Sequence, residues 1–172
     1  MIYIDFDGVI LDTEDLLFED WRRNIKFHSK TENEKVLYIQ KADWNEILNN
    51  SPILNDSLYY LNNMDPNETC ILTKIHSLSN EGKEKIRWIR EKGIEQNVIL
   101  VPYHNKKTDL VRATGNILID DCLKNLDDWL LDGGKPILFD SNDDDYDSWN
   151  QYNDKGYEKV LSLSKFINKK AN

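Results

Sequence analysis

Residues 1–15 read MIYIDFDGVILDTED and place two acids, Asp5 and Asp7, directly after a short apolar run. Gly8 follows them at once. Two carboxylates this close repel each other, and a carboxylate taken out of water is costly. A cation and an anionic substrate are the simplest groups that offset this cost. The stretch therefore predicts a strand end at which both meet.

The composition suits one globular domain of 172 residues, 40% of them hydrophobic. A formal net charge of −9 argues against a nucleic-acid polymer or an anionic membrane as the main partner. A small phosphorylated substrate stays compatible with this charge, because a bound metal ion inverts the local field. No apolar stretch has the length of a membrane span, and no leader pattern precedes residue 2, so we expect a cytoplasmic protein. Cys70 and Cys122 fit neither a disulfide framework nor a zinc site, and we expect buried free thiols.

Five short runs of β-branched and other apolar residues predict buried strands. They are residues 2–6, 69–73, 97–101, 116–119 and 136–139. Helical patterns lie between them, and this alternation is typical of an α/β fold with a Rossmann-like parallel sheet flanked by helices. Such sheets bind ligands beyond the carboxyl ends of their strands, near the point where the strand order reverses. We therefore expect the chemistry at strand ends.

Helices are predicted before the second strand and after the second, fourth and fifth strands. Their ranges are residues 51–64, 78–93, 122–134 and 157–170. Ser51 suits the N-cap of the first helix, and Gly93 and Gly133 suit the ends of the next two. The last is amphipathic with a basic final turn, which favours a helix that closes the chain.

A long segment without a strand pattern separates the first predicted strand from the second. Residues 14–50 predict two or three helices with a polar turn near residues 29–34. The segment is too long for a simple crossover. We predict a small helical cap over the end of the first strand, with residues 1–13 and 51–172 forming the core domain.

The predicted strand ends and the loop before the fourth strand carry the residue types that phosphoryl transfer needs. They are Asp5, Asp7, Thr73, Lys106, Lys107, Asp120 and Asp121. Paired carboxylates hold Mg²⁺ through oxygen ligands, and a carboxylate can attack phosphorus to form an aspartyl-phosphate. A second carboxylate can move the proton of the leaving oxygen, while a hydroxyl and a lysine bind the phosphate. Parallel, adjacent strands would bring all of these groups to one edge.

These motifs resemble those of the haloacid dehalogenase (HAD) superfamily of phosphatases. DFDGV at residues 5–9 resembles motif I, ILT at residues 71–73 motif II, and ILIDD at residues 117–121 motif IV. Lys107 or Lys106 resembles the lysine of motif III. All four come in the family's order, which makes the resemblance far more specific than the two acids of motif I alone.

The resemblance implies roles for the acids. Asp5 would be the nucleophile and a metal ligand, and Asp7 the general acid and base, with its backbone carbonyl on the metal. Asp121 would be the motif IV ligand of Mg²⁺, with Asp120 beside it. A turn or helix cap after a strand is the alternative interpretation of Asp5 and Asp7.

The resemblance also implies a phosphate site, formed by Thr73 with Lys74, by Gly8 and by the motif III lysine. Gly8 would let the backbone turn sharply and approach the substrate. NKKTDL followed by LIDD is similar to the 5'(3')-deoxyribonucleotidase branch, which favours Lys107 as the residue that stabilises the phosphoryl group and Asp5. Lys106 stays open, because the spacing to motif IV is longer here than in that branch.

The same branch carries a small helical cap after motif I, whose aromatic side chains stack on a base. The candidates here are Phe18, Trp21, Phe27, Tyr38 and Trp44, although residues at this spacing also fill the core of a cap. A nucleoside monophosphate is thus the expected substrate. A sugar phosphate or another small metabolite is the alternative, because FDGVILDTE also resembles the phosphoglucomutase-like branch. A binding module without turnover ranks last, because both motif I acids are present.

Two further sets of residues have no clear place in these motifs. The histidines His28, His76 and His104 make no metal-ligand spacing, and exposed loop positions are expected for them. The acidic tract at residues 140–149 lacks the glycine and the closing glutamate of a calcium loop. We expect a solvated loop there, with Asp140 at the end of a strand.

Overall fold

The computed structural model describes residues 1–23, 31–141 and 156–167. In these residues six strands form a parallel sheet in the order β3-β2-β1-β4-β5-β6. The strands are β1 (Ile2–Ile4), β2 (Thr69–Ile75), β3 (Asn97–Pro102), β4 (Ile117–Asp120), β5 (Lys135–Phe139) and β6 (Glu158–Val160). The α/β fold and the five predicted strands are confirmed, with ends shifted by one or two residues.

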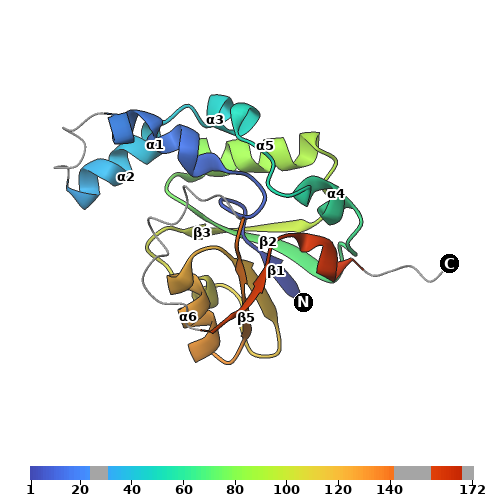
Figure 1. Cartoon of the computed structure of the whole chain (residues 1–172). Helices are drawn as coiled ribbons and strands as arrows, with labels where there is room; N and C mark the ends of the chain where they lie inside the picture. The colour runs from blue at the N-terminus through green and yellow to red at the C-terminus, as the bar shows by residue number, and fades with distance from the viewer. Residues whose placement is uncertain (24–30, 142–155, 168–172) are drawn as a thin grey trace.

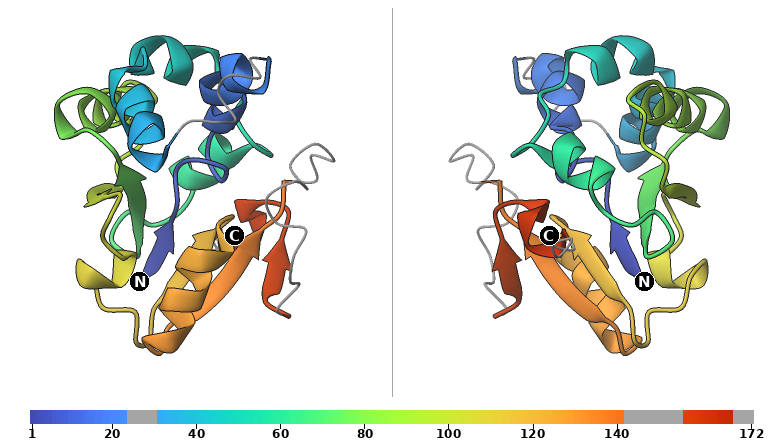
Figure 2. Two further views of the ribbon diagram at one scale, coloured as in Figure 1. Left: turned by 90° about the vertical axis from the view of Figure 1, so that its left-hand side faces the viewer. Right: turned by 90° about the vertical axis from the view of Figure 1, so that its right-hand side faces the viewer.

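Helices cover both faces of this sheet (Figures 1 and 2). Their bounds are α1 (Thr13–Arg23), α2 (Glu32–Lys41), α3 (Trp44–Asn50), α4 (Ser57–Asn62), α5 (Lys83–Glu91) and α6 (Leu123–Leu131). Helix α6 lies on one face, while α4 and α5 lie on the other, where α3 packs beside α5. A π-helical turn, η2 (Leu78–Gly82), leads into α5, and a 3₁₀ turn, η3 (Lys107–Asp109), precedes β4.

The core has two layers, because neighbouring strand residues point to opposite faces. Ile119 packs in the larger cluster with Trp88 of α5, whereas Leu118 packs in the smaller one with Trp129 of α6. Both faces of the sheet are therefore covered by apolar side chains. Polar side chains of the strands can reach solvent at the strand ends, where the predicted site acids lie.

The helix predicted over residues 51–64 is much shorter than expected. Ser51 is the C-cap of α3 rather than an N-cap, and its backbone N–H donates to the Ile47 carbonyl at 2.9 Å. Helix α4 begins only at Ser57, since Asn55 and Asp56 adopt left-handed φ values of 43° and 58°.

An extended contact occupies the beginning of that predicted helix. The Asp12 N–H donates to the Pro52 carbonyl at 3.0 Å, and the Leu54 N–H donates to the Ile10 carbonyl at 3.0 Å. This short pairing ties the chain after motif I to the chain after α3. A tertiary contact has overridden the local helix signal of serine and proline.

The helix predicted at residues 157–170 is wrong. The chain forms the edge strand β6, whose Lys159 lies beside Leu138 of β5, and then the 3₁₀ turn η5 (Leu163–Phe166). Val160 of β6 and Leu163 of η5 are buried in the core, whereas Leu161 between them is exposed. Residues 168–172 lie outside the described residues.

The remaining expectations divide as follows. Predicted helices at residues 78–93 and 122–134 are present as η2 with α5 and as α6, and Gly93 and Gly133 follow them with positive φ. Among the described residues, α1 to α3 occupy the segment predicted as the cap, with α1 beginning one residue before it at Thr13, and their role as a cap stays a prediction. Cys70 is buried, but Cys122 is exposed, contrary to expectation. None of the described helices is long and apolar enough to cross a membrane.

Candidate active site

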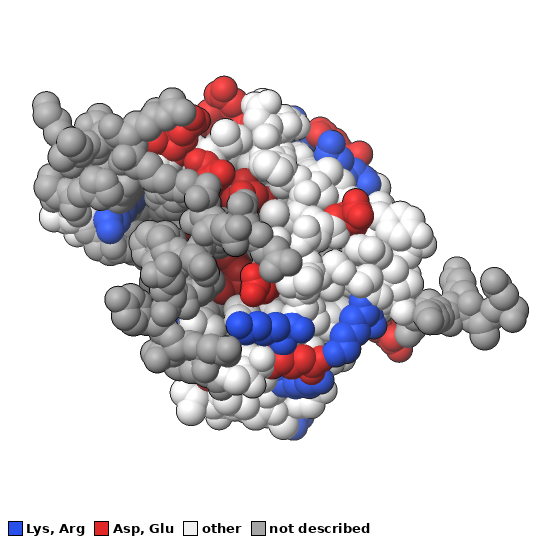
Figure 3. Space-filling model, viewed as in Figure 1, with Lys and Arg blue, Asp and Glu red and all other residues white. Residues whose placement is uncertain are grey.

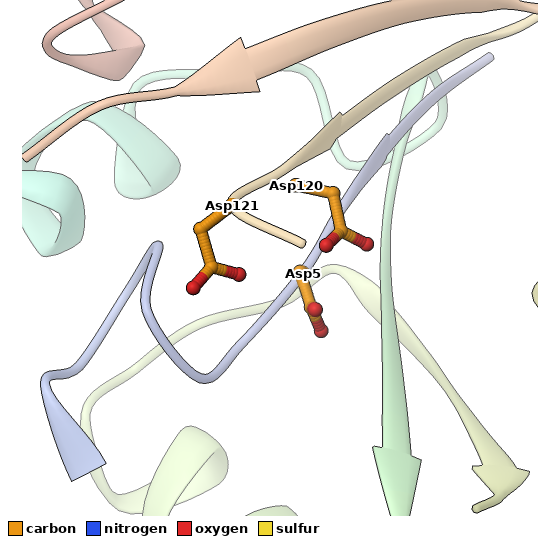
Figure 4. A group of neighbouring side chains, drawn as sticks. All are labelled: Asp5, Asp120 and Asp121. Carbon is orange, nitrogen blue, oxygen red and sulfur yellow. The ribbon is translucent and has the colours of Figure 1, made fainter. Parts of the chain in front are cut away.

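Asp5 of motif I and both acids of motif IV meet at the carboxyl edge of the sheet (Figure 4). Asp5 follows β1, Asp120 ends β4, and these two strands pair side by side. One carboxylate oxygen from each of Asp5, Asp120 and Asp121 lies within 4.8 Å of the others. Strand order reverses at β1, so this cluster occupies the crevice where such sheets bind ligands.

Lys107 lies between two of these acids. Its Nζ is 2.8 Å from Asp5 Oδ2 and 2.6 Å from Asp120 Oδ2, and its side chain is buried. Lys106 points elsewhere, with its half-exposed ammonium 2.7 Å from Asp128 Oδ1. Of the two lysines that the sequence left open, Lys107 is the one that lies beside Asp5.

Asp120 is engaged by protein donors on both oxygens. Oδ2 accepts from Lys107 at 2.6 Å, and Oδ1 accepts from the Cys122 N–H at 2.9 Å. The side-chain amide of Asn125 donates to both oxygens at 3.1–3.2 Å. Asp120 therefore fits an anchor for Lys107 better than a metal ligand. Asn125 was not predicted from the sequence, because a polar residue in an amphipathic helix resembles its solvated face.

Burial and crowding change the acidity of this cluster. Burial, reinforced by the charge of Asp120, raises the pKa of Asp5 to about 7, although Lys107 acts in the opposite direction. Burial followed by the charges of Asp120 and Asp5 also raises the pKa of Asp121. Burial alone would lower the pKa of Lys107, but Asp120 and Asp5 raise it above its ordinary value. The cluster thus carries more negative charge than its lysine balances.

This donor set fits Mg²⁺. Hard carboxylate oxygens are the ligands that this ion prefers, and a divalent cation would offset the repulsion among the acids. Asp5 and Asp121 are the side chains best placed to hold it, since Lys107, Cys122 and Asn125 engage Asp120.

Gly8 allows the motif I turn to approach motif IV. Its φ is +69°, a left-handed conformation that glycine adopts without strain. A Cβ at this position would lie 2.1 Å from Asp121 Oδ2. The structure therefore places Gly8 directly against a proposed metal ligand, and any side chain there would displace that carboxylate.

Asp7 is held from both sides. Its Oδ1 accepts from the Thr13 hydroxyl at 2.7 Å. Its Oδ2 accepts from Lys85 Nζ at 2.5 Å and more weakly from the Thr73 hydroxyl at 3.4 Å. Thr73, predicted to bind phosphate, is fully buried beside these groups, and the carbonyl of Lys74 accepts from Lys85 at 3.3 Å.

Lys85 and Glu81 are two further polar residues of the site that sequence reasoning missed. Lys85 is fully buried, and its ammonium lies 2.8 Å from Glu81 Oε1. Burial acts to lower the pKa of Lys85, but the charges of Asp7 and Glu81 outweigh it and raise that pKa. For Glu81, burial acts to raise the pKa, but the charge of Lys85 outweighs it and lowers that pKa. A glutamate four residues before a lysine in a helix usually indicates a surface pair, so the sequence carried no signal of this burial.

A cavity of about 190 Å³ opens onto these groups. Asp5, Asp7, Asp121 and Lys74 line it from the sheet edge, and helices α1 to α3 close its other side. The wall residues from these helices are Thr13, Glu14, Leu17, Phe18, Ile39 and Trp44. Acidic side chains gather along the upper and central part of the face shown in Figure 3.

Of the aromatic, histidine and acidic residues singled out in the sequence, some line the site cavity and others lie elsewhere. Among the proposed aromatics, Phe18 and Trp44 line this cavity, whereas Tyr38 lines a separate groove of about 950 Å³ among α1, α2 and α3. His76 also lines the site cavity, while His104 is exposed. The Trp21 side chain, Phe27, His28 and most of the tract at residues 140–149 lie outside the described residues. Asp140 is half-buried and does not line the cavity.

Comparison with known proteins places this site on a known fold. No family model and no curated protein sequence matches the chain. Solved structures do match it. A HAD hydrolase of family IA, variant 3, from Entamoeba histolytica has a TM-score of 0.58 at 12% identity, over 95% of this chain and 93% of that chain.

Two further structures are similar. β-Phosphoglucomutase from Clostridium difficile has a TM-score of 0.51 at 17% identity, over 95% of this chain and 91% of that one. The magnesium-bound HAD-hydrolase YfnB from Bacillus subtilis has a TM-score of 0.55 at 14% identity, over 95% of both chains. At these identities the likeness shows a shared fold. The chain has the α/β fold of HAD hydrolases, and its structural neighbours are members of that superfamily.

Proposed function

We propose that the protein is a Mg²⁺-dependent phosphatase that hydrolyses a small phosphomonoester through an aspartyl-phosphate on Asp5. The observation that carries this proposal is the position of Asp5. Its carboxylate lies at the carboxyl edge of the sheet, 2.8 Å from a buried lysine and beside Asp121, on the wall of a cavity. A HAD-like fold and a magnesium-bound neighbour support the same reaction class.

Mg²⁺ would be held by Asp5, Asp121 and the backbone carbonyl of Asp7, and would neutralise phosphate charge that otherwise repels the acids. Asp5 attacks phosphorus, so that a carboxylate oxygen–phosphorus bond forms and the bond to the leaving oxygen breaks. Asp7 gives a proton to that oxygen, and an alcohol departs. Lys107 balances the charge of Asp5 and of the phosphoryl group.

The second half of the reaction regenerates the protein. Asp7, now a carboxylate, takes a proton from a water molecule, whose oxygen attacks the phosphoryl group. The bond between Asp5 and phosphorus breaks, inorganic phosphate leaves, and Asp5 is again a carboxylate. The walls from α1 to α3 restrict bulk water at the nucleophile.

Cavity size favours a sugar phosphate or a metabolite of similar size over the nucleoside monophosphate expected from the sequence. Its 190 Å³ is smaller than the roughly 300–1,000 Å³ of common ligand pockets. Trp44, the largest aromatic of the wall, is 2% exposed and donates its ring N–H to the Ile39 carbonyl, so it offers little surface for a base. Two neighbours, a heptose bisphosphate phosphatase and β-phosphoglucomutase, are named for sugar phosphates.

A nucleoside monophosphate is the second candidate. His76, on the cavity wall, stacks on the exposed Tyr103 with ring centroids 4.9 Å apart and an interplanar angle of 14°. A nucleobase could stack on this pair of rings beside the site. The similarity of NKKTDL and LIDD to the deoxyribonucleotidase branch points the same way.

A panel of sugar phosphates and nucleoside monophosphates, assayed for phosphate release with Mg²⁺ and with EDTA, tests the proposal. We expect Mg²⁺-dependent release that is highest for a sugar phosphate, and none from Asp5→Asn. Asp56→Asn is the matched control, because this exposed acid makes no side-chain cap bond at α4. Highest release from nucleotides would favour the second candidate. No release from any ester by the folded protein would reject the enzyme and leave a binding module.

A further inference from the structure

Lys85 enters the site from outside the four motifs, on helix α5. Its ammonium is 2.5 Å from Asp7 Oδ2 and 2.8 Å from Glu81 Oε1, and its side chain is wholly buried. It also lies 3.4 Å from the Thr73 hydroxyl. One ammonium thus contacts Asp7, the proposed proton-transfer residue, together with Thr73 of β2 and Glu81 of η2.

Stability alone is a poor reason for this arrangement. A buried ion pair adds little to stability compared with apolar residues of similar volume, since desolvation of its charges offsets their attraction. The ammonium lies over the rings of Phe6 and Trp44, 5.5 Å and 5.0 Å from their centroids, in a place where an apolar side chain would pack well. A charge retained here fits a role in the adjacent site.

Glu81 makes Lys85 a fixed donor rather than a mobile one. Its Oε2 accepts from the His76 N–H at 2.6 Å, while its Oε1 accepts from Lys85. The imidazole Nδ1 of His76 lies 3.4 Å from the same carboxylate. Glu81 is 2% exposed and bonded at both oxygens, so it fixes the place of the ammonium. From there the ammonium makes a short contact with Asp7 at 2.5 Å and longer ones with the Lys74 carbonyl at 3.3 Å and the Thr73 hydroxyl at 3.4 Å.

We propose that Lys85, anchored by Glu81, is a positioning residue that orients the Asp7 carboxyl group for proton transfer. Lys85 and Thr73 hold Oδ2, whereas Oδ1 accepts from a neutral hydroxyl, that of Thr13, at 2.7 Å. A hydroxyl can turn away where an ammonium held by Glu81 cannot, so Oδ1 is the oxygen that gives the proton to the leaving oxygen and later takes one from water. The inference rests on the proposed phosphatase function and adds a specific element to it. It assigns Lys85 no contact with the substrate.

Leaving-group dependence separates this role from a structural one. The p-nitrophenolate of p-nitrophenyl phosphate leaves without a proton, whereas an alkoxide needs one from Asp7. General acid catalysis is typically worth about 10²–10⁴-fold. For Lys85→Met we expect kcat/KM to fall about 100-fold on an alkyl phosphate that the wild type hydrolyses, and less than about 10-fold on p-nitrophenyl phosphate.

Three further variants keep the test decisive. Lys85→Met with Glu81→Gln removes both charges, so no unpaired carboxylate stays buried, and the same difference between the two esters is expected. Lys85→Arg keeps a donor for Asp7 and should restore part of the activity on the alkyl ester. Lys106→Met is the matched control, since this exposed lysine pairs with Asp128 and should leave both esters unaffected. Thermal unfolding of each variant identifies any that fails to fold.

Two negative results are distinguishable. A wild-type protein that hydrolyses neither ester with Mg²⁺ rejects the phosphatase function and the inference with it. A wild type that hydrolyses both, combined with equal losses on both esters in the double variant, overturns the positioning role alone.

Discussion

The two halves of the site each bury a lysine between two carboxylates. On the β4 side, Lys107 lies between Asp5 and Asp120, with nitrogen–oxygen distances of 2.8 and 2.6 Å. On the β2 side, Lys85 lies between Asp7 and Glu81, at 2.5 and 2.8 Å. In the β4 half Asp5 lines the cavity and Asp120 anchors the lysine from behind, whereas in the β2 half both Asp7 and Glu81 line the cavity.

The halves differ in charge. The β4 half holds a third acid, Asp121, and burial with mutual repulsion raises the pKa values of Asp5 and Asp121. In the β2 half, Lys85 offsets the effect of burial and lowers the pKa of Glu81. Three carboxyl groups around one lysine suit a half that binds a cation, whereas two carboxyl groups around one lysine suit a half that holds one of them in place.

The largest difference between the halves is expected from their lysines. Lys107→Met leaves Asp5 and Asp120 without a counter-charge and removes a donor that stabilises the phosphoryl group, so kcat should fall about 10²–10³-fold on both alkyl and aryl esters. This uniform loss contrasts with the leaving-group dependence expected for Lys85. Steady-state kinetics on both esters measures it, with Lys106→Met as the neighbouring control. Losses that depend on the leaving group would mean that the two lysines share one role.

Gly8→Ala should weaken only the cation-binding half. The added Cβ would lie 2.1 Å from Asp121 Oδ2, and the left-handed backbone adds strain. We expect the Mg²⁺ concentration for half-maximal activity to rise about tenfold or more, in line with losses seen when metal-ligand orientation is disturbed. Titration of activity with Mg²⁺ measures this. An unchanged Mg²⁺ requirement would place the ion away from Asp121.

Acidity gives a stability test of the same half in EDTA. The pKa of Asp5 is raised from 3.8 to about 7, so between these values the folded state holds a proton that the unfolded state has released. The contribution of Asp5 to the free energy of unfolding is therefore present at low pH and declines as pH rises from about 4 through 7. Melting temperatures in EDTA should fall across this range, and Asp5→Asn should reduce the fall and raise the melting temperature at pH 7.5. A melting temperature that rises over the same range would contradict the crowding of these acids.

A partly exposed carboxylate on the edge strand β6 should show the opposite sign and the smallest effect. Lys135 and Lys165 lower the pKa of Glu158 in β6 to about 2, from an ordinary 4.5. The contribution of Glu158 to the free energy of unfolding is present above pH 4.5 and is lost as pH falls through about 2. Glu158→Gln should slightly lower the melting temperature at pH 7, with an effect that shrinks in high salt because solvent screens the pair. An effect that is independent of salt would show that packing, not charge, is involved.

The two halves also differ in how far the sequence predicted them. Asp5, Asp120, Asp121 and Lys107 follow or precede strands whose β-branched runs are unambiguous, and parallel pairing brings strand ends together. Lys85 belongs to a helix rich in charge, where its burial depends on α3 packing over α5. Such packing between segments far apart in sequence leaves no local pattern.

The contrast between local patterns and long-range contacts also explains where the predicted secondary structure was wrong. Ser51 and Pro52 have good local chemistry for a helix start, but the bond from the Asp12 N–H to the Pro52 carbonyl draws this stretch into an extended pairing. Residues 157–170 have helical periodicity, yet β5 offers a free parallel edge, and β6 forms on it. In both places a long-range backbone contact overrode local propensity.

Trapping of the phosphorylated protein tests the central claim most directly. Wild type mixed with a hydrolysed phosphate ester and Mg²⁺, quenched in acid within one turnover, should show one added phosphoryl group on the peptide that contains Asp5. Asp5→Asn should show none, and Asp7→Asn should show more of the adduct at later times, because its breakdown needs a base. Turnover by the wild type with no adduct on that peptide, or undiminished turnover by Asp5→Asn, would contradict covalent catalysis at Asp5.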